Sequence, residues 1–452
     1  MTDAAGEGAL PLAHRLLDAA RAAGADAADA LVVAGASLSV EVRAGKLEEA
    51  TRAEGIDLGL RVLVGRRQAV VSSSDRRPAT FALMAERAVA MAREAPEDPS
   101  AGLAEPGLLA TTRDASALDL CDPSPEPDPA ALETRAREAE AAALAVQGVS
   151  QVEAASASWA RREVALAATN GFAARLLRSD ASLSCGAIAG TGTGMERDWD
   201  WDGRVFASDL RPPAEIGRTA GERAAARLHP RRPATGTYPV LFDERVAASL
   251  VGHLLSAVNG AAVARGATFL RDAMGQAVLP AGMSLLEDPH RPRLGASRPW
   301  DAEGLPTAPR AIVEDGRLLT WTLDLATGRR LGLSSTANAA RGPGGAPQPA
   351  VTNVALTQGT ATRADLIARM GTGLLVTSLI GSTINPNTGD YSRGAGGFWV
   401  ERGEVAHPVS EVTVAGNLRD MLLRLVPAND ARTHLSRVVP SLLVEGLTVA
   451  GG

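Results

Sequence analysis

Apolar residues recur at helical spacing in several stretches of the first 230 residues. Leu12, Leu16 and Ala20 lie about one helical turn apart, so we expect a helix over Leu10–Ala23. A proline is tolerated in the first turn of a helix, and Pro78 is expected to open the second one. The remaining helices are predicted at Pro78–Glu94, Ala130–Val146 and Pro212–Leu228.

Between these helices apolar and polar positions alternate, which is the pattern of half-buried strands. Glycines at 35, 45 and 65 divide the pattern into short runs that we expect to pair as antiparallel hairpins. Asn170-Gly171 is a strong signal for a tight turn between two strands. The predicted strands are Ala30–Ala34, Leu38–Arg43, Leu58–Val64, Ala69–Ser73, Val152–Trp159, Glu163–Thr169 and Phe172–Arg178.

The second half of the chain predicts one helix, Glu244–Val258, and many short strands. Scattered glycine and proline favour a closed or strongly curved sheet. The fold class is therefore α+β, with a mixed N-terminal domain at 1–230 and a β-rich domain at 235–452. Proline and acidic residues at 96–129 predict a surface excursion. The strands are expected at Tyr238–Phe242, Arg310–Glu314, Arg317–Trp321, Val351–Leu356, Leu374–Ile380, Gly397–Val400, Val405–Ala406 and Thr413–Ala415.

Composition narrows the class of protein. Hydrophobic residues make up 45% of the 452 residues and charged residues 22%, which is typical of globular chains. The net charge of -6 argues against direct nucleic-acid binding, because phosphate contacts need concentrated positive charge. Arg227, Arg231 and Arg232 form a local basic run, which we interpret as a solvated helix end.

Cysteine content and apolar runs bear on the compartment. Cys121 and Cys185 form no CxxC pair and make no disulfide framework, which favours a reducing environment. The first residues lack the basic and apolar regions of a signal peptide. The longest apolar stretches, 366–384 and 250–264, are interrupted by polar residues such as Arg369. We expect a soluble, cytoplasmic protein with no membrane contact.

The usual catalytic motifs are missing from the sequence. No histidine is followed by glutamate, so HExxH and its variants are absent, and no GxSxG elbow is present. The run Gly190–Gly194 is followed by an acid-aromatic stretch in place of a helix, so we interpret it as a strand end or turn. Cys185 lies in an apolar strand and is expected to be a buried structural thiol.

Three carboxylates alternate with aromatic residues just after that turn. Asp198, Asp200 and Asp202 occupy every second position, so on a strand they share one face. Such a cluster can bind a cation, but a solvated acidic face is the interpretation we favour.

The C-terminal part resembles the signature region of the TldD/PmbA family. The run Met370–Met421 contains GDYSRGAGGFW (Gly389–Trp399) and AGNLRDM (Ala415–Met421), in the order and spacing of that family. Further similarity lies in ASRPWDAEG (Ala296–Gly304) and in GMERDWDWD (Gly194–Asp202). The resemblance covers about the whole chain and is firmer after Tyr238 than before it.

That family contains two kinds of chain. The TldD kind carries a His-Glu-x-x-x-His zinc motif on the first helix of its second domain, and the PmbA (TldE) kind lacks it. Aligned with that motif, this sequence has Gly252, His253 and Ala257. The cysteine that completes the family's metal site has no counterpart in 434–447. The resemblance thus implies a PmbA-type chain that binds no metal and has no catalytic residue of its own.

The signature segment supplies the remaining candidate residues. Its glycines suit positive φ or close approach of another chain, and Asp390 and Arg393 are able to pair with each other. We expect a loop that lines either a subunit interface or a peptide chamber. A structural loop that ties strands together is an equally supported interpretation. The candidate residues are Gly389, Asp390, Tyr391, Ser392, Arg393, Gly394, Phe398 and Trp399.

The resemblance implies a function in partnership. A zinc-bearing TldD-type subunit would be the partner, and unfolded or extended peptides, such as microcin precursors or antitoxins, the substrates. Two alternatives remain open at this stage. One is a non-proteolytic regulator that binds a protein partner, in keeping with the family's label of DNA gyrase modulator. The other is a homodimeric peptidase with an unrecognised metal site.

Overall fold

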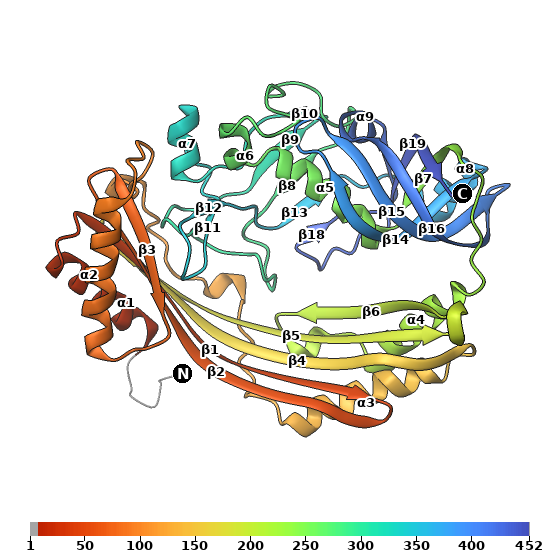
Figure 1. Ribbon diagram of the computed structural model, residues 1–452, viewed down its shortest axis with the longest axis horizontal. Coiled ribbons are helices and arrows are strands. Elements are labelled where there is room, and N and C mark those ends of the chain that lie inside the picture. Colours follow the sequence, from red (N-terminus) through yellow and green to blue (C-terminus); the bar gives the residue numbers. More distant parts are fainter. Residues whose placement is uncertain (1–7, 452) are drawn as a thin grey trace.

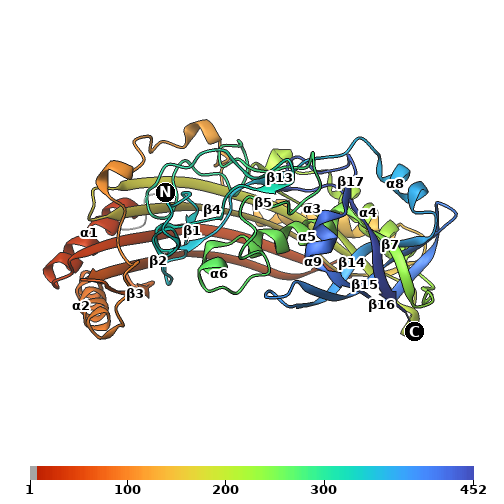
Figure 2. The same cartoon turned by 90° about the horizontal axis from the view of Figure 1, so that it is seen from above.

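A long, curved sheet lies beneath the C-terminal half of the molecule in the computed structural model (Figure 1). The structure describes residues 8–451, without the side chains of residues 382 and 383. Seen from above, the long strands extend from α1 and α2 at one end to the region beneath α5 and α9 at the other (Figure 2). Helices and strands are mixed throughout, so the predicted α+β class is confirmed.

The curved sheet contains six antiparallel strands in the order β3-β2-β1-β4-β5-β6. Even-numbered residues of β1 from Ala28 to Val42 are buried, apart from the half-buried Ala34, and face the helices. The α-helices described for this half, α1 to α4, therefore cover one face of the sheet. The elements are α1 (Ala9–Ala22), β1 (Ala27–Arg43), β2 (Lys46–Val64), β3 (Arg67–Ser73), α2 (Pro78–Glu94), α3 (Pro129–Leu144), β4 (Val149–Ala168), β5 (Ala173–Ala189), β6 (Glu196–Arg204) and α4 (Pro213–Ala226).

The predicted short strands of this half were wrong in length. Gly35 does not end a strand, because β1 continues through it and pairs with strands on both sides. A Cβ atom at this position would lie 2.6 Å from the carbonyl oxygen of Arg161 in β4, so glycine permits the close approach of the two strands. The Asn170-Gly171 turn is confirmed: it joins β4 to β5, and Gly171 has a φ of +96°.

The C-terminal half is built around a closed five-stranded barrel. Strands β16, β15, β14, β7 and β19 pair in that order, and β16 also pairs with β19. The predicted barrel-like sheet is therefore confirmed, although its strands are longer than expected. The barrel and its helices are β7 (Gly236–Phe242), α5 (Glu244–Ala257), α8 (Arg363–Met370), β14 (Gly373–Ile384), β15 (Asp390–Glu401), β16 (Glu404–Asn417), α9 (Leu418–Leu423), β17 (Leu425–Pro427) and β19 (Leu442–Ala450).

A second, smaller sheet packs beside the barrel in the order β10-β9-β8-β13-β18. Its last strand, β18, brings the segment before β19 toward α5. The elements are α6 (Gly260–Ala264), β8 (Leu285–Glu287), β9 (Arg310–Glu314), β10 (Arg317–Leu318), α7 (Leu325–Leu331), β11 (Ala339–Ala340), β12 (Gln348–Pro349), β13 (Val354–Leu356) and β18 (Arg437–Val438).

The proline-rich segment between α2 and α3 joins the two halves. Its Ala110 amide donates to the carbonyl of Gly304, 2.8 Å away. The Arg329 guanidinium donates to the carbonyls of Ser100 and Leu103 at 3.0 and 2.8 Å. The segment therefore contributes buried contacts as well as surface.

No helix in the part of the chain that the structure describes is both long and apolar enough to cross a membrane.

A cluster of buried charges ties β1 and β2 to the C-terminal half. Arg61 donates to the Asp29 carboxylate at 2.7 Å, and Arg341 forms an ion pair with the same carboxylate. Nearby, the Glu303 side chain accepts a hydrogen bond from the Leu325 amide at 2.8 Å. Burial, and then the charge of Asp301, raises the pKa of Glu303.

Glu303 makes stability depend on pH. A carboxyl whose pKa is higher in the folded than in the unfolded chain gains protons on folding, so the free energy of unfolding falls as the pH rises between the two values. Replacing Glu303 with glutamine keeps an acceptor for Leu325 and removes this titration. We expect similar thermal midpoints at pH 5 and a more stable variant at pH 8, measured by calorimetry.

Glu303→Ala is the matched control. It leaves the buried Leu325 amide without its acceptor, so it should be less stable than Glu303→Gln by about 1–3 kcal/mol at both pH values. Parallel pH profiles for the wild type and Glu303→Gln would contradict the raised pKa.

Candidate functional site

Helix α5 places the aligned metal positions against the barrel. Asp243 caps the helix by accepting from the Arg245 amide at 3.2 Å. The predicted apolar face is confirmed, because Leu250, Leu254 and Leu255 are all buried in the main core. This face fixes the rotation of the helix and so determines where residues 252, 253 and 257 lie.

The aligned positions offer one imidazole. The His253 ring packs edge-on against Tyr391 of β15, with centroids 6.1 Å apart. Its Nε2 atom is buried without a hydrogen-bond partner among residues 8–451. Burial, and then the nearby Arg393 charge, lowers the pKa of His253, so the ring is favoured in its neutral form. Ala257 is buried, and its carbonyl accepts from Thr268 at 2.7 Å.

Arginine stands beside the first aligned position. A Cβ atom at Gly252 would lie 3.6 Å from Nη1 of Arg437 in β18. Within residues 8–451, no group of three or more His, Cys, Asp or Glu side chains is arranged to hold a metal ion. Zinc sites need about three such ligands, and a guanidinium nearby repels a cation. The residues at this place therefore do not fit the family's metal.

The signature segment is a strand, and the prediction of a loop was wrong. Residues 390–401 form β15, which pairs with β14 and β16 inside the closed barrel. Only Gly389, at the turn before the strand, has a positive φ, +82°. Gly397 allows β14 and β15 to approach each other closely, because a Cβ atom there would lie 1.9 Å from the Leu375 carbonyl oxygen of β14.

The aromatic candidates of this strand belong to the core. Tyr391 is 1% exposed, and Trp399 packs edge-on against Tyr238 at 4.9 Å. Phe398 points to the other side of the strand and packs in a separate cluster with Leu366. Burial raises the pKa of Tyr391 to about 12. The nearby Arg393 acts in the opposite direction and lowers the pKa of Tyr391. The Tyr391 hydroxyl has no hydrogen-bond partner among the described residues.

The predicted pair of Asp390 with Arg393 does not form. Thr388 and Asn417 donate to the Asp390 carboxylate at 2.6 and 3.1 Å, and these bonds lower its pKa. Arg393 donates to the carbonyl of Gly381 at 2.8 Å. Residues at i and i+3 of a strand lie on opposite faces, which separates the two side chains. Ser392 is exposed and Arg393 is half-buried, whereas Gly394 lies against Ile380 of β14.

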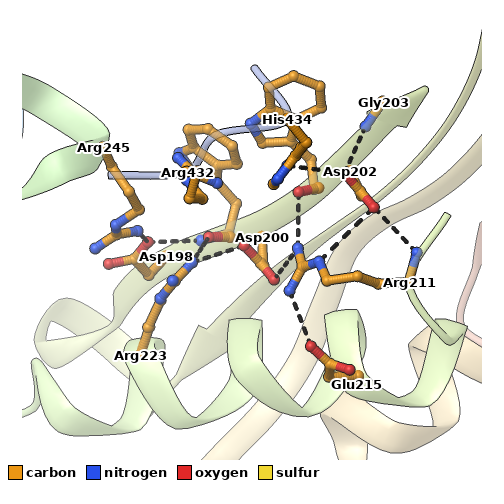
Figure 3. A network of polar contacts seen from close by, with 12 residues as sticks. Asp198, Asp200, Asp202, Gly203, Arg211, Glu215, Arg223, Arg245, Arg432 and His434 are labelled. Carbon is orange, nitrogen blue, oxygen red and sulfur yellow. Dashed lines mark hydrogen bonds and ion pairs between the residues drawn. The ribbon is translucent and has the colours of Figure 1, made fainter. Parts of the chain in front are cut away.

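The acidic residues of β6 form a buried ion network (Figure 3). Asp198, Asp200 and Asp202 are 7%, 2% and 2% exposed, so both sequence interpretations, a cation site and a solvated acidic face, were wrong. Arg211 and Arg223 donate to opposite oxygens of Asp200, each at 2.8 Å. Figure 3 shows Arg223 reaching the strand from the underlying helix α4. The three carboxylates are thus neutralised by arginines from later in the chain.

The two outer aspartates of this network, Asp198 and Asp202, contact residues of the C-terminal half. Asp198 accepts from Arg245 at 2.9 Å and from Arg227 at 3.4 Å. Arg227 also donates to Ser378 of β14 at 3.1 Å, so its interpretation as part of a solvated helix end was wrong. His434 approaches Asp202 at 3.6 Å. The network therefore holds the edge of the sheet against the start of α5 and the segment before β18.

Asp202 itself stays ionised. Burial opposes its charge, but a hydrogen bond from the Arg211 amide at 3.0 Å and one from Arg204 at 2.9 Å lower its pKa overall. Burial, and then the Arg204 charge, lowers the pKa of His434. The contact between His434 and Asp202 therefore involves a largely neutral ring near neutral pH.

A cavity of about 730 Å³ lies above this network, between the concave face of the sheet and the C-terminal half. Trp199 and Trp201 alternate with the aspartates of β6 and so face the cavity. No motif in the sequence pointed to the basic residues of this cavity. The alternation of tryptophan with aspartate was the available signal, because it indicates that the two faces of β6 lie in different surroundings. The arginines that line the cavity are Arg162, Arg178, Arg204, Arg245, Arg293, Arg432 and Arg437.

Most of the chain matches the domains of one protein family. The PmbA/TldA metallopeptidase C-terminal domain matches residues 235–451, the central domain matches 122–228, and domain 1 matches 28–92. Metalloprotease PmbA of Escherichia coli O157:H7 is 36% identical over 94% of this chain and 92% of its own length. A PmbA homologue of Haemophilus influenzae is 33% identical over 96% and 94%.

Solved structures share the fold. A protein of Bacteroides thetaiotaomicron, described as a proposed modulator of DNA gyrase, superposes with a TM-score of 0.90 over all of both chains at 25% identity. TldE of Thermococcus kodakarensis gives a TM-score of 0.83 over 97% of this chain and all of that one, at 20% identity.

Proposed function

The chain belongs to the PmbA/TldD metallopeptidase family as a PmbA-type member, and from that premise we propose that it is the subunit without a metal centre in a two-subunit peptidase complex. In this proposal a TldD-type partner supplies both zinc and the general base. The complex cleaves unfolded or extended peptides of the microcin-precursor or antitoxin type.

The observation that carries the proposal is the surroundings of α5. At the positions of the family's zinc motif the chain has Gly252, His253 and Ala257, and the guanidinium of Arg437 stands beside the first of them. A single neutral imidazole supplies too few ligands for a catalytic zinc. The hydrolytic ion must then be held by another chain if the complex cleaves peptides.

An open sheet edge supports the need for a partner. Strand β2 pairs with β3 only from Leu58 to Val64. Among the described residues, positions 46–55 pair with β1 alone, and they are exposed. Exposed edges of this kind accept a strand from another molecule. The same edge would also permit a homodimer, so the assay below includes the chain alone.

Proteolysis should require both chains. We expect an unstructured peptide to be cleaved by the chain mixed with a TldD-type subunit, and to persist with this chain alone. Cleavage is followed by mass spectrometry, assembly by size-exclusion chromatography, and zinc content by elemental analysis of each chain. Equal cleavage by the partner without this chain would refute the supporting role. Stoichiometric zinc on this chain, with turnover to match, would establish the homodimeric peptidase.

A regulator without proteolysis is the second candidate. A relative of similar fold is described as a proposed modulator of DNA gyrase. Co-purification separates the two functions: a TldD-type chain favours the peptidase complex, and a topoisomerase alone favours the regulator.

A further inference from the structure

The cavity above β6 carries an excess of positive charge. Its lower wall comes from β5 and β6, and its upper wall from the start of α5 and residues 432–439. Among the described residues that line it, only Asp180 and Glu244 are acidic. Both are already paired inside the cavity, Asp180 with Arg162 and Glu244 with Arg432 at 2.9 Å.

Most of the arginines that line the cavity form ion pairs with carboxylates of this chain. Arg204 pairs with Asp202 at 2.9 Å, and Arg245 pairs with Asp198, also at 2.9 Å. Arg293 pairs with Asp119 at 2.7 Å. These guanidiniums shape the walls, but their charge is largely balanced by carboxylates of the protein.

Arg178 and Arg437 are different, because within residues 8–451 neither forms an ion pair with a carboxylate. Arg178 donates to two carbonyls, those of Gly295 and Ser297, at 2.7 and 2.6 Å. Arg437 is exposed, and its guanidinium makes no hydrogen bond to another described residue; its neighbour is the bare backbone of Gly252. The cavity thus has cationic groups whose counter-ions must come from outside this chain.

Flat apolar surface accompanies this charge. Trp199 is 51% exposed and Trp201 is half-buried, and both line the cavity. Large apolar side chains left exposed in a concave site indicate contact with a ligand. The volume of about 730 Å³ is within the range of ligand-binding pockets.

We propose that this cavity binds a carboxylate-bearing segment of an extended peptide, with Arg437 and Arg178 meeting the carboxylate and Trp199 and Trp201 contacting the apolar part. Arginine and carboxylate form charge-assisted, bidentate hydrogen bonds, which gives the preference for carboxylate over amide. The peptide nature of the ligand rests on the proposed function. The subunit thereby selects the substrates that its partner cleaves, by anchoring an acidic side chain or the C-terminal carboxylate.

Calorimetric titration of the isolated chain tests this. An acetylated, unstructured peptide with two glutamates should bind about tenfold more tightly than its glutamine twin, the size of one charge-assisted hydrogen bond. Amidated versions of both peptides distinguish the sources of the carboxylate. Loss of affinity on amidation identifies the C-terminal group, and loss only with glutamine identifies the side chains.

Two variants and a control locate the binding. Arg437→Gln should abolish the glutamate preference, and its exposed position makes it neutral for folding. Arg178→Gln is examined beside it after its thermal midpoint has been measured. Arg419→Gln removes an exposed arginine of α9 outside the cavity and should leave binding unchanged. Equal affinity for all four peptides, with or without glutamate and with or without the amide, or an unaffected Arg437→Gln variant would overturn the proposal.

The proposed function is judged separately. Cleavage by the two-chain complex with no difference among the glutamate, glutamine and amidated peptides overturns the anchoring site and leaves the peptidase complex standing. Carboxylate-selective binding by this chain without any assembly or cleavage supports the site and removes only its assignment to a peptidase.

Discussion

Replacing Asp200 with alanine is expected to lower the free energy of unfolding by about 3 kcal/mol. The carboxylate is 2% exposed and holds Arg211 and Arg223, one on each oxygen at 2.8 Å. Removing it leaves Arg223 with no carboxylate partner among the described residues, and leaves Arg211 with Glu215 at 3.3 Å and the more distant Asp202. This cost exceeds that of a surface ion pair because water has little access to the site. The arginines there lose both a compensating charge and hydrogen bonds that water cannot replace.

Urea unfolding followed by tryptophan fluorescence measures this effect. The matched control is Glu153→Ala, because the Glu153 pair with Arg197 is 3.4 Å long and exposed on both sides. Exposed pairs of this kind contribute about 0–1 kcal/mol, so the control should unfold nearly as the wild type does. Asp200→Asn preserves the shape and should fall between the two. If Asp200→Ala and Glu153→Ala shift the midpoint equally, the buried ion network of β6 does not stabilise the fold.

Local signals in the sequence predicted the helices well. Helix α2 spans Pro78–Glu94, as expected, because a proline in the first turn is a local mark of a helix start. Helix α5 begins at Glu244, as expected, and Asp243 caps it from its own side chain. These boundaries depend on residues within one turn of each other, so no knowledge of the tertiary structure was needed.

Strand lengths and charge partners were not predictable in the same way. β1 passes through Gly35 because neighbouring strands continue on both sides, and no local signal reports that. The alternation of Asp198 to Asp202 did place the carboxylates on one face. Their partners lie far along the chain, however: Arg245 is 47 residues after Asp198, and it approaches only because α5 starts at the edge of the sheet. The local sequence therefore cannot distinguish a solvated acidic face from a buried ion network.

The signature strand shows the same limit in another form. Its density of glycine predicted a loop, because glycine is usually read as a residue for turns. In the barrel these glycines instead have extended backbone and allow β14 and β15 to approach. Whether the strand also contributes to peptide binding or assembly is a separate question, which a pair of glycine variants can answer.

Gly397→Ala should cost about 3 kcal/mol or prevent folding of the barrel, because overpacking against backbone cannot be relieved by a rotamer change. The added Cβ would lie 1.9 Å from the Leu375 carbonyl oxygen. Gly394→Ala, three residues earlier in the same strand, places its Cβ 3.3 Å from the Ile380 oxygen and should cost far less. Thermal unfolding of both variants measures the difference, and equal midpoints would contradict the close approach of the strands.

The Gly394→Ala variant then separates structure from function. If the strand serves only to close the barrel, this variant should assemble with a TldD-type partner and support peptide cleavage as the wild type does. Normal stability combined with lost assembly or cleavage would instead place residues 389–394 at the subunit interface or the peptide path. Position 394 is suited to this test because it lies near the exposed Ile380 on β14, where an added methyl group alters the surface more than the core.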